Sequence, residues 1–304
     1  MDVLRPVLAV DIGGSKLAAA LVGADGAVVR AERVPTGPDP WPALRDLLER
    51  VRAGEAVRGV GVACPGPVRW PEGVVSPPNF PAWQDGFPLL PALRAAYPGL
   101  PVRMHNDAVA VAVGEHWKGA GRGVPDLLGM VASTGVGGGI VTGGRVLPGR
   151  SGNAGHVGHL VVEVDGPACG CGGRGCVEAV ARGPALVAWA RERGSPATDG
   201  RELAEAAAAG EPVALAALAR GGRALGAGIA GAAALLDVEL VVLGGGLSQS
   251  GPALWEPLLA SVAEHAALGY LTGLRVVPTA LGQDSGLVGA AAFVHAAETY
   301  DVPG

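Results

Sequence analysis

The chain has 304 residues, of which 49% are hydrophobic and 17% are charged, and its formal net charge is -5 at pH 7. A chain of this length and apolar content can bury a large core, so we expect a folded protein of two domains or lobes. Because the net charge is negative and Lys and Arg form no long run, the composition argues against a nucleic-acid partner or a membrane surface. No apolar run is long enough to cross a bilayer and the start lacks a secretory pattern, so a cytoplasmic location is predicted.

The first element is a strand–turn–strand unit. Residues 7–10 and 17–22 read as short apolar strands, and the glycine-rich sequence DIGGSK between them predicts the tip of a hairpin. Glycines let backbone N–H groups approach a phosphate, while the polar side chains add donors and the carboxylate could hold a metal ion through water. A plain hairpin turn is the alternative. The residues that could bind a nucleotide phosphate here are Asp11, Gly13, Gly14, Ser15 and Lys16.

A helix and two further strands follow. Residues 41–52 have helical spacing, residues 59–63 read as a buried strand, and residues 80–90 read as a loop. We expect Cys64, next to a proline turn, to be a buried thiol. Residues 102–105 form the next predicted strand.

The end of that strand carries Asn106 and Asp107, followed by a helix of small residues at 108–117. Phosphorylation of an alcohol requires an acceptor for the hydroxyl proton and a donor that fixes the hydroxyl, and these are roles open to Asp107 and Asn106. The alternative is a helix N-cap, since Asp or Asn at this place satisfies the first backbone N–H groups of a helix.

The opening pattern then recurs. Residues 127–132 and 140–142 read as strands around the glycine-rich segment 133–139, which indicates a duplicated α/β lobe with a boundary near 119–125. The second turn offers another phosphate cradle, although neither turn has the spacing of a Walker loop. Its candidate nucleotide-binding residues are Thr134, Gly135 and Gly137.

The C-terminal half is mostly helical. We expect helix over residues 183–236 with a break at 194–200, a strand at 239–243, and a closing helix at 286–297. Strands alternating with helices predict mainly parallel sheets covered by helices. A glycine turn at a strand end leaves room for a flat nucleoside. The residues of that turn are Gly244, Gly245 and Gly246.

Three of the four cysteines cluster within one glycine-rich segment. Cys169, Cys171 and Cys176 have a spacing that suits a structural zinc ion, and His159 is the natural fourth ligand. A predicted strand at 160–164, followed by a turn, would bring the chain back to that histidine. A disulfide between two of the cysteines would leave the third unexplained in a reducing cell.

Taken together, these motifs resemble the ROK family (repressor, open reading frame, kinase) of actin-like sugar kinases. The order and spacing agree from residue 7 to residue 289, with Ser15 standing where the family usually has Thr. The matching segments are DIGGSK at 11–16, NDA at 106–108, STGVGGG at 133–139, and the zinc signature built from GH at 158–159, CGC at 169–171 and GCVEA at 175–179.

The resemblance implies an α/β, actin-like (ribonuclease H-like) fold of two lobes with a structural zinc site. A small lobe would comprise residues 1–118 with the C-terminal helix 286–304, and a large lobe with the zinc-binding segment would comprise residues 119–285. The implied cofactors are ATP, Mg²⁺ and structural Zn²⁺, and the implied reaction moves the γ-phosphoryl group to the primary hydroxyl of a sugar. The resemblance also implies a homodimer.

By motif position, Asp107 would be the general base, while Asn106, His159 and Glu178 would contact the sugar. Asn79, in the sequence PPNFPAW, resembles the sugar-binding asparagine of bacterial glucokinases. His159 would serve twice, with one ring nitrogen on zinc and the other directed toward the sugar.

His156 departs from the glucokinase pattern, which has glutamate at this place. A neutral imidazole offers one donor and one acceptor where a carboxylate offers only acceptors. The same histidine occurs in bacterial N-acetylmannosamine kinases, whereas the segments 78–83 and 152–155 resemble glucokinases. The acceptor therefore stays open between glucose, N-acetylmannosamine and a sugar-like cyclitol. A sugar-sensing regulator that binds without turnover is a further alternative, although only ten residues precede Asp11, where repressor members carry a DNA-binding segment.

Overall fold

The fold is described from a computed structural model, which covers residues 5–77 and 80–302. The chain divides into two compact units, and each is described by itself. The first unit comprises Met1–Pro125, Gly139–Gly155 and Thr279–Gly304, and the second comprises Asp126–Gly138 and His156–Pro278. The first cut, after Pro125, falls at the end of the boundary expected at 119–125, whereas residues 139–155, expected in the large lobe, group with the first unit. Within that unit, the Asn153 side chain bonds to the backbone of Val68 through both its oxygen and its nitrogen.

The first unit is built on a five-stranded mixed sheet. The strands β1 and β2 form the expected antiparallel hairpin, β3 extends it, and β4 and β7 run parallel to β1. The strand β3 is not among the elements expected from the sequence. In spatial order the strands are β3 (Val28–Pro35), β2 (Lys16–Val22), β1 (Val7–Ile12), β4 (Val60–Cys64) and β7 (Val102–Asn106).

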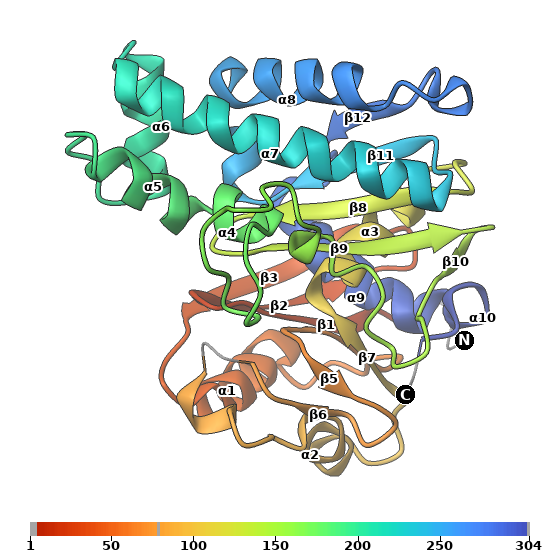
Figure 1. Cartoon of the computed structure of the whole chain (residues 1–304). Coiled ribbons are helices and arrows are strands. Elements are labelled where there is room, and N and C mark those ends of the chain that lie inside the picture. The colour runs from red at the N-terminus through yellow and green to blue at the C-terminus, as the bar shows by residue number, and fades with distance from the viewer. Residues whose placement is uncertain (1–4, 78–79, 303–304) are drawn as a thin grey trace. The chain divides into compact units, whose positions relative to one another are not determined.

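Helices cover both faces of this sheet (Figure 1). Alternate strand residues on one face share a core with the apolar sides of α1 (Pro40–Arg52) and α2 (Leu89–Ala96). The other face is covered by α9 (Ser285–His295), whose residues are buried almost throughout. A Cβ at Gly61 would overlap the carbonyl oxygen of Ala290, so α9 lies with its backbone directly on β4.

The helix α3 (Asp107–Lys118) packs on α9 at equally close range. A Cβ at Gly289 would overlap the carbonyl oxygen of Ala110, and a Cβ at Gly114 would overlap that of Ser285. The two helices therefore touch through their backbones, which only glycine at these positions permits. This contact fixes α3 against the sheet.

The second sheet repeats the order of the first. Counted along the chain, both sheets place their third, second, first, fourth and fifth strands side by side, which supports the predicted duplication. The predicted mainly parallel sheets are instead mixed, because the chain turns back into an antiparallel pair between β9 and β10 as it does in the first hairpin. In spatial order the strands are β10 (Arg145–Val146), β9 (Val136–Thr142), β8 (Leu127–Ala132), β11 (Leu240–Gly244) and β12 (Arg275–Pro278).

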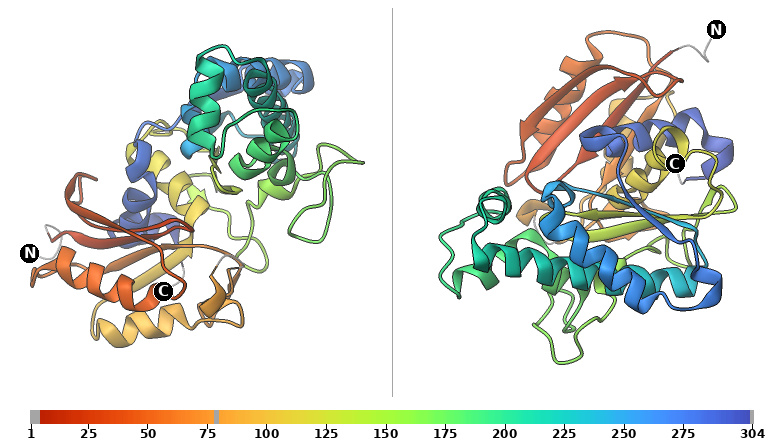
Figure 2. Two further views of the ribbon diagram at one scale, coloured as in Figure 1. Left: turned by 90° about the vertical axis from the view of Figure 1, so that its left-hand side faces the viewer. Right: turned by 90° about the horizontal axis from the view of Figure 1, so that it is seen from above.

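Helices of the second unit follow the predicted pattern. The expected helical region 183–236 is confirmed with its break, and a further short break precedes α7. Figures 1 and 2 show α7 and α8 side by side. By length and composition α7 could cross a membrane, but 61% of its apolar window is buried inside the protein, as in the core helix of a globular protein. These helices are α4 (Val177–Ala181), α5 (Gly183–Arg191), α6 (Gly200–Ala208), α7 (Pro212–Leu236) and α8 (Pro252–His265).

The remaining elements are short. A two-stranded ribbon pairs β5 (Val68–Arg69) with β6 (Val74–Val75), and α10 (Ala297–Tyr300) follows α9. The strand expected at 160–164 is absent among the described residues, where Val161 forms only an isolated bridge with Cys176. A few further backbone hydrogen bonds join residues 160–163 to 175–177, but they do not form a regular strand ladder.

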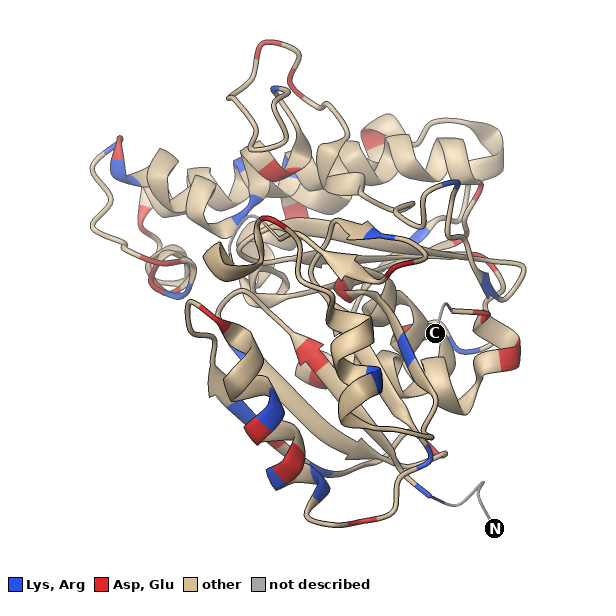
Figure 3. Cartoon of the chain, turned by 90° about the horizontal axis from the view of Figure 1, so that it is seen from below, with Lys and Arg blue, Asp and Glu red and all other residues tan. Residues whose placement is uncertain are grey.

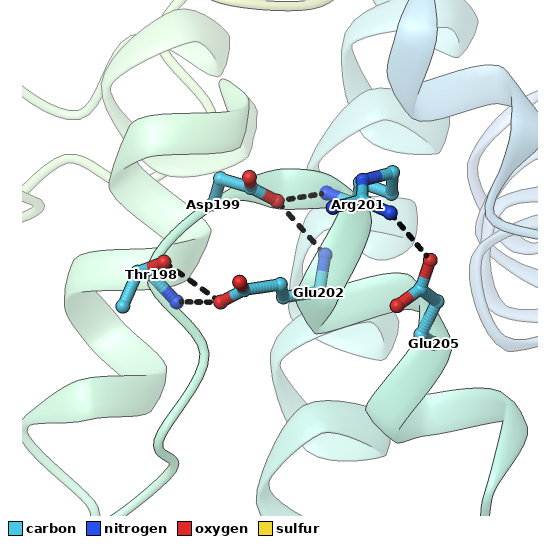
Figure 4. A network of polar contacts seen from close by, with 5 residues as sticks. All are labelled: Thr198, Asp199, Arg201, Glu202 and Glu205. Carbon is cyan, nitrogen blue, oxygen red and sulfur yellow. Dashed lines mark hydrogen bonds and ion pairs between the residues drawn. The ribbon is translucent and has the colours of Figure 1, made fainter.

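Polar side chains define the start of α6 (Figure 4). One carboxylate oxygen of Asp199 accepts hydrogen bonds from the backbone N–H groups of Arg201 and Glu202, both at 2.8 Å. Glu202 reaches back to the backbone and hydroxyl of Thr198, and Arg201 pairs with Glu205 one turn further on. This capping arrangement explains why the helix begins here after the predicted break.

Charged residues of both signs occur along α1, and the ribbon in Figure 3 is coloured by their charge. Arg50 pairs with Glu32 of the neighbouring β3 at 3.0 Å. The helix carries three basic and two acidic residues, Arg45, Asp46, Glu49, Arg50 and Arg52, and this mixture agrees with a solvated face rather than a polyanion-binding one.

Two helical glycines make a matched test of this packing. Gly289→Ala should destabilise the protein by about 1–3 kcal/mol, because the added methyl group overlaps the backbone of Ala110. Gly231→Ala, on an exposed side of α7 with open space around it, should instead stabilise the protein by up to about 1 kcal/mol. Urea unfolding of both variants measures the difference, and equal effects would contradict the α3–α9 backbone contact.

Candidate functional site

The tip of the first hairpin is held in shape by a hydrogen bond within the turn and by two hydrogen bonds from Thr36, the residue that follows β3. The N–H of Gly13 donates to the carbonyl of Lys16 at 3.0 Å, which closes the turn. The hydroxyl of Thr36 donates to the carbonyl of Gly13 at 2.8 Å, and the N–H of Thr36 donates to the carbonyl of Ser15 at 3.1 Å. With Gly14, Ser15 and Lys16 exposed, the tip presents its polar groups to solvent.

Asn106 and Asp107 stand where β7 passes into α3. The Asn106 side-chain oxygen accepts from the N–H of Ala108 at 3.0 Å, so the predicted N-cap exists and Asn106 provides it. Asp107 is the first helical residue, and one of its oxygens accepts from the same N–H at 2.8 Å. Because Asn106 caps the helix, the Asp107 side chain is not needed as the N-cap and can take the catalytic role.

Asp11 and Asp107 lie at the same edge of the first sheet. In the register of the parallel strands, Asp11 is opposite Ala63, and Ala63 is opposite His105. Burial, and after it the negative charge of Asp11, raise the pKa of Asp107 to about 7, although hydrogen bonds such as the one from the N–H of Ala108 act to lower it. Burial likewise raises the pKa of Asp11 to about 6, opposed by the positive charges of Lys16 and Arg33.

The second glycine turn is tied to Glu178. One carboxylate oxygen of Glu178 accepts from the N–H of Val136 at 2.9 Å, and a Cβ at Gly135 would stand 2.8 Å from that oxygen. The N–H of Gly183 donates to the carbonyl of Ser133 at 2.8 Å, which attaches the start of α5 to the turn. Glu178 thus supports the turn that holds the exposed Thr134 and the half-buried Gly137.

The turn after β11 is close to the same loop. Gly245 has φ 90°, and a side chain there would overlap the backbone of Ala132. The hydroxyl of Ser248 donates to the carbonyl of Gly245 at 2.7 Å, and the indole of Trp255 donates to the carbonyl of Ser248 at 2.8 Å. Gly244 ends β11 and Gly246 begins the short 3₁₀ turn that follows, so these contacts hold all three predicted glycines in one conformation.

The predicted metal ligands converge. The ligand atoms of His159, Cys169, Cys171 and Cys176 all lie within 4.8 Å of one another. The Cys169 sulfur is 3.7 Å from Nδ1 of His159, and the sulfurs of Cys171 and Cys176 are 3.8 Å apart. Zn–S bonds of about 2.3 Å at tetrahedral angles separate two sulfurs by about 3.8 Å. The donor set and its spacing therefore fit a tetrahedral zinc ion.

The segment that carries these ligands is fastened to the rest of its unit. The guanidinium of Arg220 on α7 pairs with the carboxylate of Glu163 at 2.9 Å and also contacts the carbonyl of Val180. The N–H groups of Val162 and Glu163 both donate to the carbonyl of Gly175. These contacts hold the two arms of the loop together where the expected strand is missing.

His156 is exposed and lies beside His159. The two rings are stacked, with their centroids 6.2 Å apart and their planes 17° from parallel. Because Nδ1 of His159 faces Cys169, the ring has a second nitrogen left for another partner. The predicted sugar ligand Asn79 lies outside the described residues.

The remaining candidate residues therefore fall into two groups, one in each unit. Within the first unit the structure brings the two aspartates together, and within the second it brings together the glycine turns, Glu178 and the metal ligands. The first group comprises Asp11, Gly13, Gly14, Ser15, Lys16, Asn106 and Asp107; the second comprises Thr134, Gly135, Gly137, His156, His159, Glu178, Gly244, Gly245 and Gly246, with the cysteines.

Comparison with known proteins identifies the class. The sequence model of the ROK family matches residues 7–297. The glucokinase of Thermotoga maritima is 36% identical over 308 residues, covering 95% of this chain and 96% of that protein. The N-acetylmannosamine kinase of Shigella flexneri is 38% identical over 291 residues, covering 94% and 97%. The chain belongs to the ROK family.

Solved structures agree with this assignment. The crystal structure of a ROK family glucokinase from Streptomyces griseus, in complex with glucose and AMPPNP, matches with a TM-score of 0.84 at 34% identity, covering 95% of this chain and 98% of that one. The predicted actin-like fold of the ROK sugar kinases is thereby confirmed.

The two raised pKa values predict how stability depends on pH. Between about pH 4 and pH 7 the folded protein keeps a proton on Asp107 that the unfolded chain has lost, so stability falls as pH rises through this window. Asp107→Asn removes this dependence. Urea unfolding without nucleotide or metal should therefore show the variant gaining stability relative to the wild type as pH rises from 4 to 8. If the difference in unfolding free energy between the variant and the wild type stays constant from pH 4 to 8, the raised pKa of Asp107 is contradicted.

Proposed function

We propose that this chain, an ATP-dependent sugar kinase by its family and its full-length relatives, transfers the γ-phosphoryl group of ATP to the primary hydroxyl of a hexose-type sugar with Asp107 as the general base. The observation that carries the proposal is a carboxylate at a strand end whose pKa of about 7 suits proton transfer near neutral pH. The sugar oxygen forms a bond to the γ-phosphorus, the bond to the leaving ADP oxygen breaks, and the hydroxyl proton passes to Asp107.

Asn106 would help to orient the sugar. Its oxygen caps α3, which leaves the amide nitrogen as the group that can donate to a sugar hydroxyl. His159, His156 and Glu178 are the further sugar contacts proposed from the family resemblance. For Glu178, the hydrogen bond from Val136 occupies one carboxylate oxygen, so the other is the oxygen proposed for the sugar.

The nucleotide and its metal ion would be held by the glycine turns. Asp11 supplies the carboxylate that can hold Mg²⁺ through water. Burial raises the pKa of this carboxyl group to about 6, and a bound cation would favour its ionised form. Bound Mg²⁺ would neutralise charge on the transferring phosphoryl group. The exposed Ser15 and Lys16 would donate to phosphate oxygens from the tip of the first hairpin.

If His156 contacts the acceptor, the preferred acceptor differs from glucose. The imidazole can donate a hydrogen bond where the glutamate of the usual pattern cannot, and an acetamido carbonyl is a suitable acceptor for it. N-acetylmannosamine is the acceptor that this feature favours, with glucose and a cyclitol as alternatives. The predicted homodimer and cytoplasmic location stay predictions.

Kinetics of the wild type and of Asp107→Asn test the reaction. With glucose, mannose, N-acetylmannosamine, N-acetylglucosamine and cyclitols in an ADP-coupled assay, the wild type should phosphorylate at least one acceptor, and kcat/KM should decline below about pH 7 as Asp107 takes up a proton. The variant should lose about 10²–10⁴-fold in kcat with modest change in sugar affinity.

Asp237→Asn, at the left-handed C-cap of α7, is the matched control and should leave kcat unchanged. Retained activity in Asp107→Asn would remove the base assignment. Sugar binding without turnover by the wild type would favour the sugar-sensing regulator instead.

We further propose that the cysteine cluster holds structural zinc. Cys171→Ser should lose the bound metal and lower the melting temperature, because it removes one of four ligands. Cys64→Ser, which alters a buried thiol outside the cluster, should keep the metal. Metal analysis by mass spectrometry and thermal melting measure both, and full zinc content in Cys171→Ser would disprove the ligand set.

A further inference from the structure

One buried carboxylate lies outside the residues assigned so far. Glu115 stands on α3 about two turns after Asp107, and it is fully buried. Its two oxygens accept hydrogen bonds from five donors, two hydroxyls and three backbone N–H groups. These donors are the hydroxyls of Thr279 and Ser285 and the N–H groups of Ala120, Ala280 and Leu281.

The bonds explain why a charge is tolerated at this place. Burial alone would raise the pKa of Glu115, but the hydrogen bonds from Thr279 and from the three backbone N–H groups lower it below its ordinary value. A buried carboxylate that loses such donors is left uncompensated, which is strongly unfavourable. The interaction therefore fixes the end of α3 to the segment that leads into α9.

That segment, residues 279–286, reaches the residues proposed to bind the nucleotide. The side-chain oxygen of Gln283 accepts from Nζ of Lys16 at 3.2 Å. A Cβ at Gly286 would stand 2.7 Å from a carboxylate oxygen of Asp11, so the first turn of α9 lies directly against that carboxylate. Asp284 pairs with Arg33, whose charge also acts on Asp11.

We propose that Glu115 is a positioning residue for phosphoryl transfer, which holds residues 279–286 so that Lys16 and Asp11 keep their place relative to Asp107. The inference rests on the proposed function. The hydrogen-bond donors to the Glu115 carboxylate in the described part of the chain are not themselves assigned site residues. Glu115 affects the site indirectly, because α3 carries the proposed general base Asp107 at its start and Glu115 near its end.

The geometry predicts an effect on the nucleotide side of the reaction. Residues 279–286 contact Lys16 and Asp11, whereas the hydrogen bonds that place Asn106 do not involve them. Loss of the anchor should therefore weaken nucleotide binding and slow transfer while sugar affinity changes little. Loss of a residue with a purely structural role would lower stability without weakening nucleotide binding more than sugar binding.

Glu115→Gln tests the inference. Glutamine offers one oxygen, so at least one backbone N–H group must face its NH₂ group. We expect kcat to fall by about tenfold or more and the Kd of Mg²⁺-AMPPNP to rise severalfold, with the sugar Kd within about twofold of the wild type. Glu211→Gln is the matched control, since that carboxylate also accepts two backbone N–H groups, at the start of α7, and should change stability alone.

Two milder variants cover the case in which Glu115→Gln does not fold. Ser285→Ala removes one donor and Gln283→Ala removes the partner of Lys16, and both should raise the AMPPNP Kd. Gln283→Ala added to Glu115→Gln should have little further effect, because both act through one segment. Unchanged AMPPNP affinity in all folded variants, or equal losses for sugar and nucleotide, would overturn the inference. Absence of turnover by the wild type would instead refute the proposed function, and AMPPNP binding would still test Glu115.

Discussion

The first unit depends on the backbone contacts that α9 makes with the sheet and with α3. Glycine at 61, 114 and 289 lets three pieces of backbone approach more closely than any side chain would allow. Because α3 carries Asp107 and the start of α9 lies against Asp11, this packing sets the separation of the two carboxylates and hence the effect of the Asp11 charge on the pKa of Asp107. The electrostatics of the site thus follow from steric contacts between small residues.

The duplicated strand order gives the two sheets the same means of presenting polar groups. In both, a central strand ends in a glycine turn before the chain reverses, so backbone amides gather at one edge of the sheet. The two copies have since acquired different supports. The first turn is held by Thr36, whereas the second is held by the carboxylate of Glu178. Similar turns can therefore differ in rigidity and in how they respond to a ligand.

Local features were predictable from the sequence, and features that depend on distant partners were not. The hairpin, the N-cap at Asn106 and the convergence of the four metal ligands follow from residue types at short spacing, and the structure has all three. The strand expected at 160–164 is missing because its only ladder-type pairing among the described residues is the single bridge from Val161 to Cys176, and the N–H groups of Val162 and Glu163 converge on one carbonyl, that of Gly175. Glu115 gave one signal, a lone carboxylate inside an apolar helix after Asp107, but four of its five donors lie more than 150 positions away in the chain.

The first unit combines segments from both ends of the chain, so part of it cannot fold until synthesis is nearly complete. Its sheet is formed by the first 106 residues, yet one face stays uncovered until residues 285–295 have been synthesised. During translation the ribosome therefore releases a sheet with an exposed apolar face while the whole second unit is still being made. Chaperone binding to that face, or a slow final docking of α9, would be the natural means by which a cell avoids aggregation of the nascent chain.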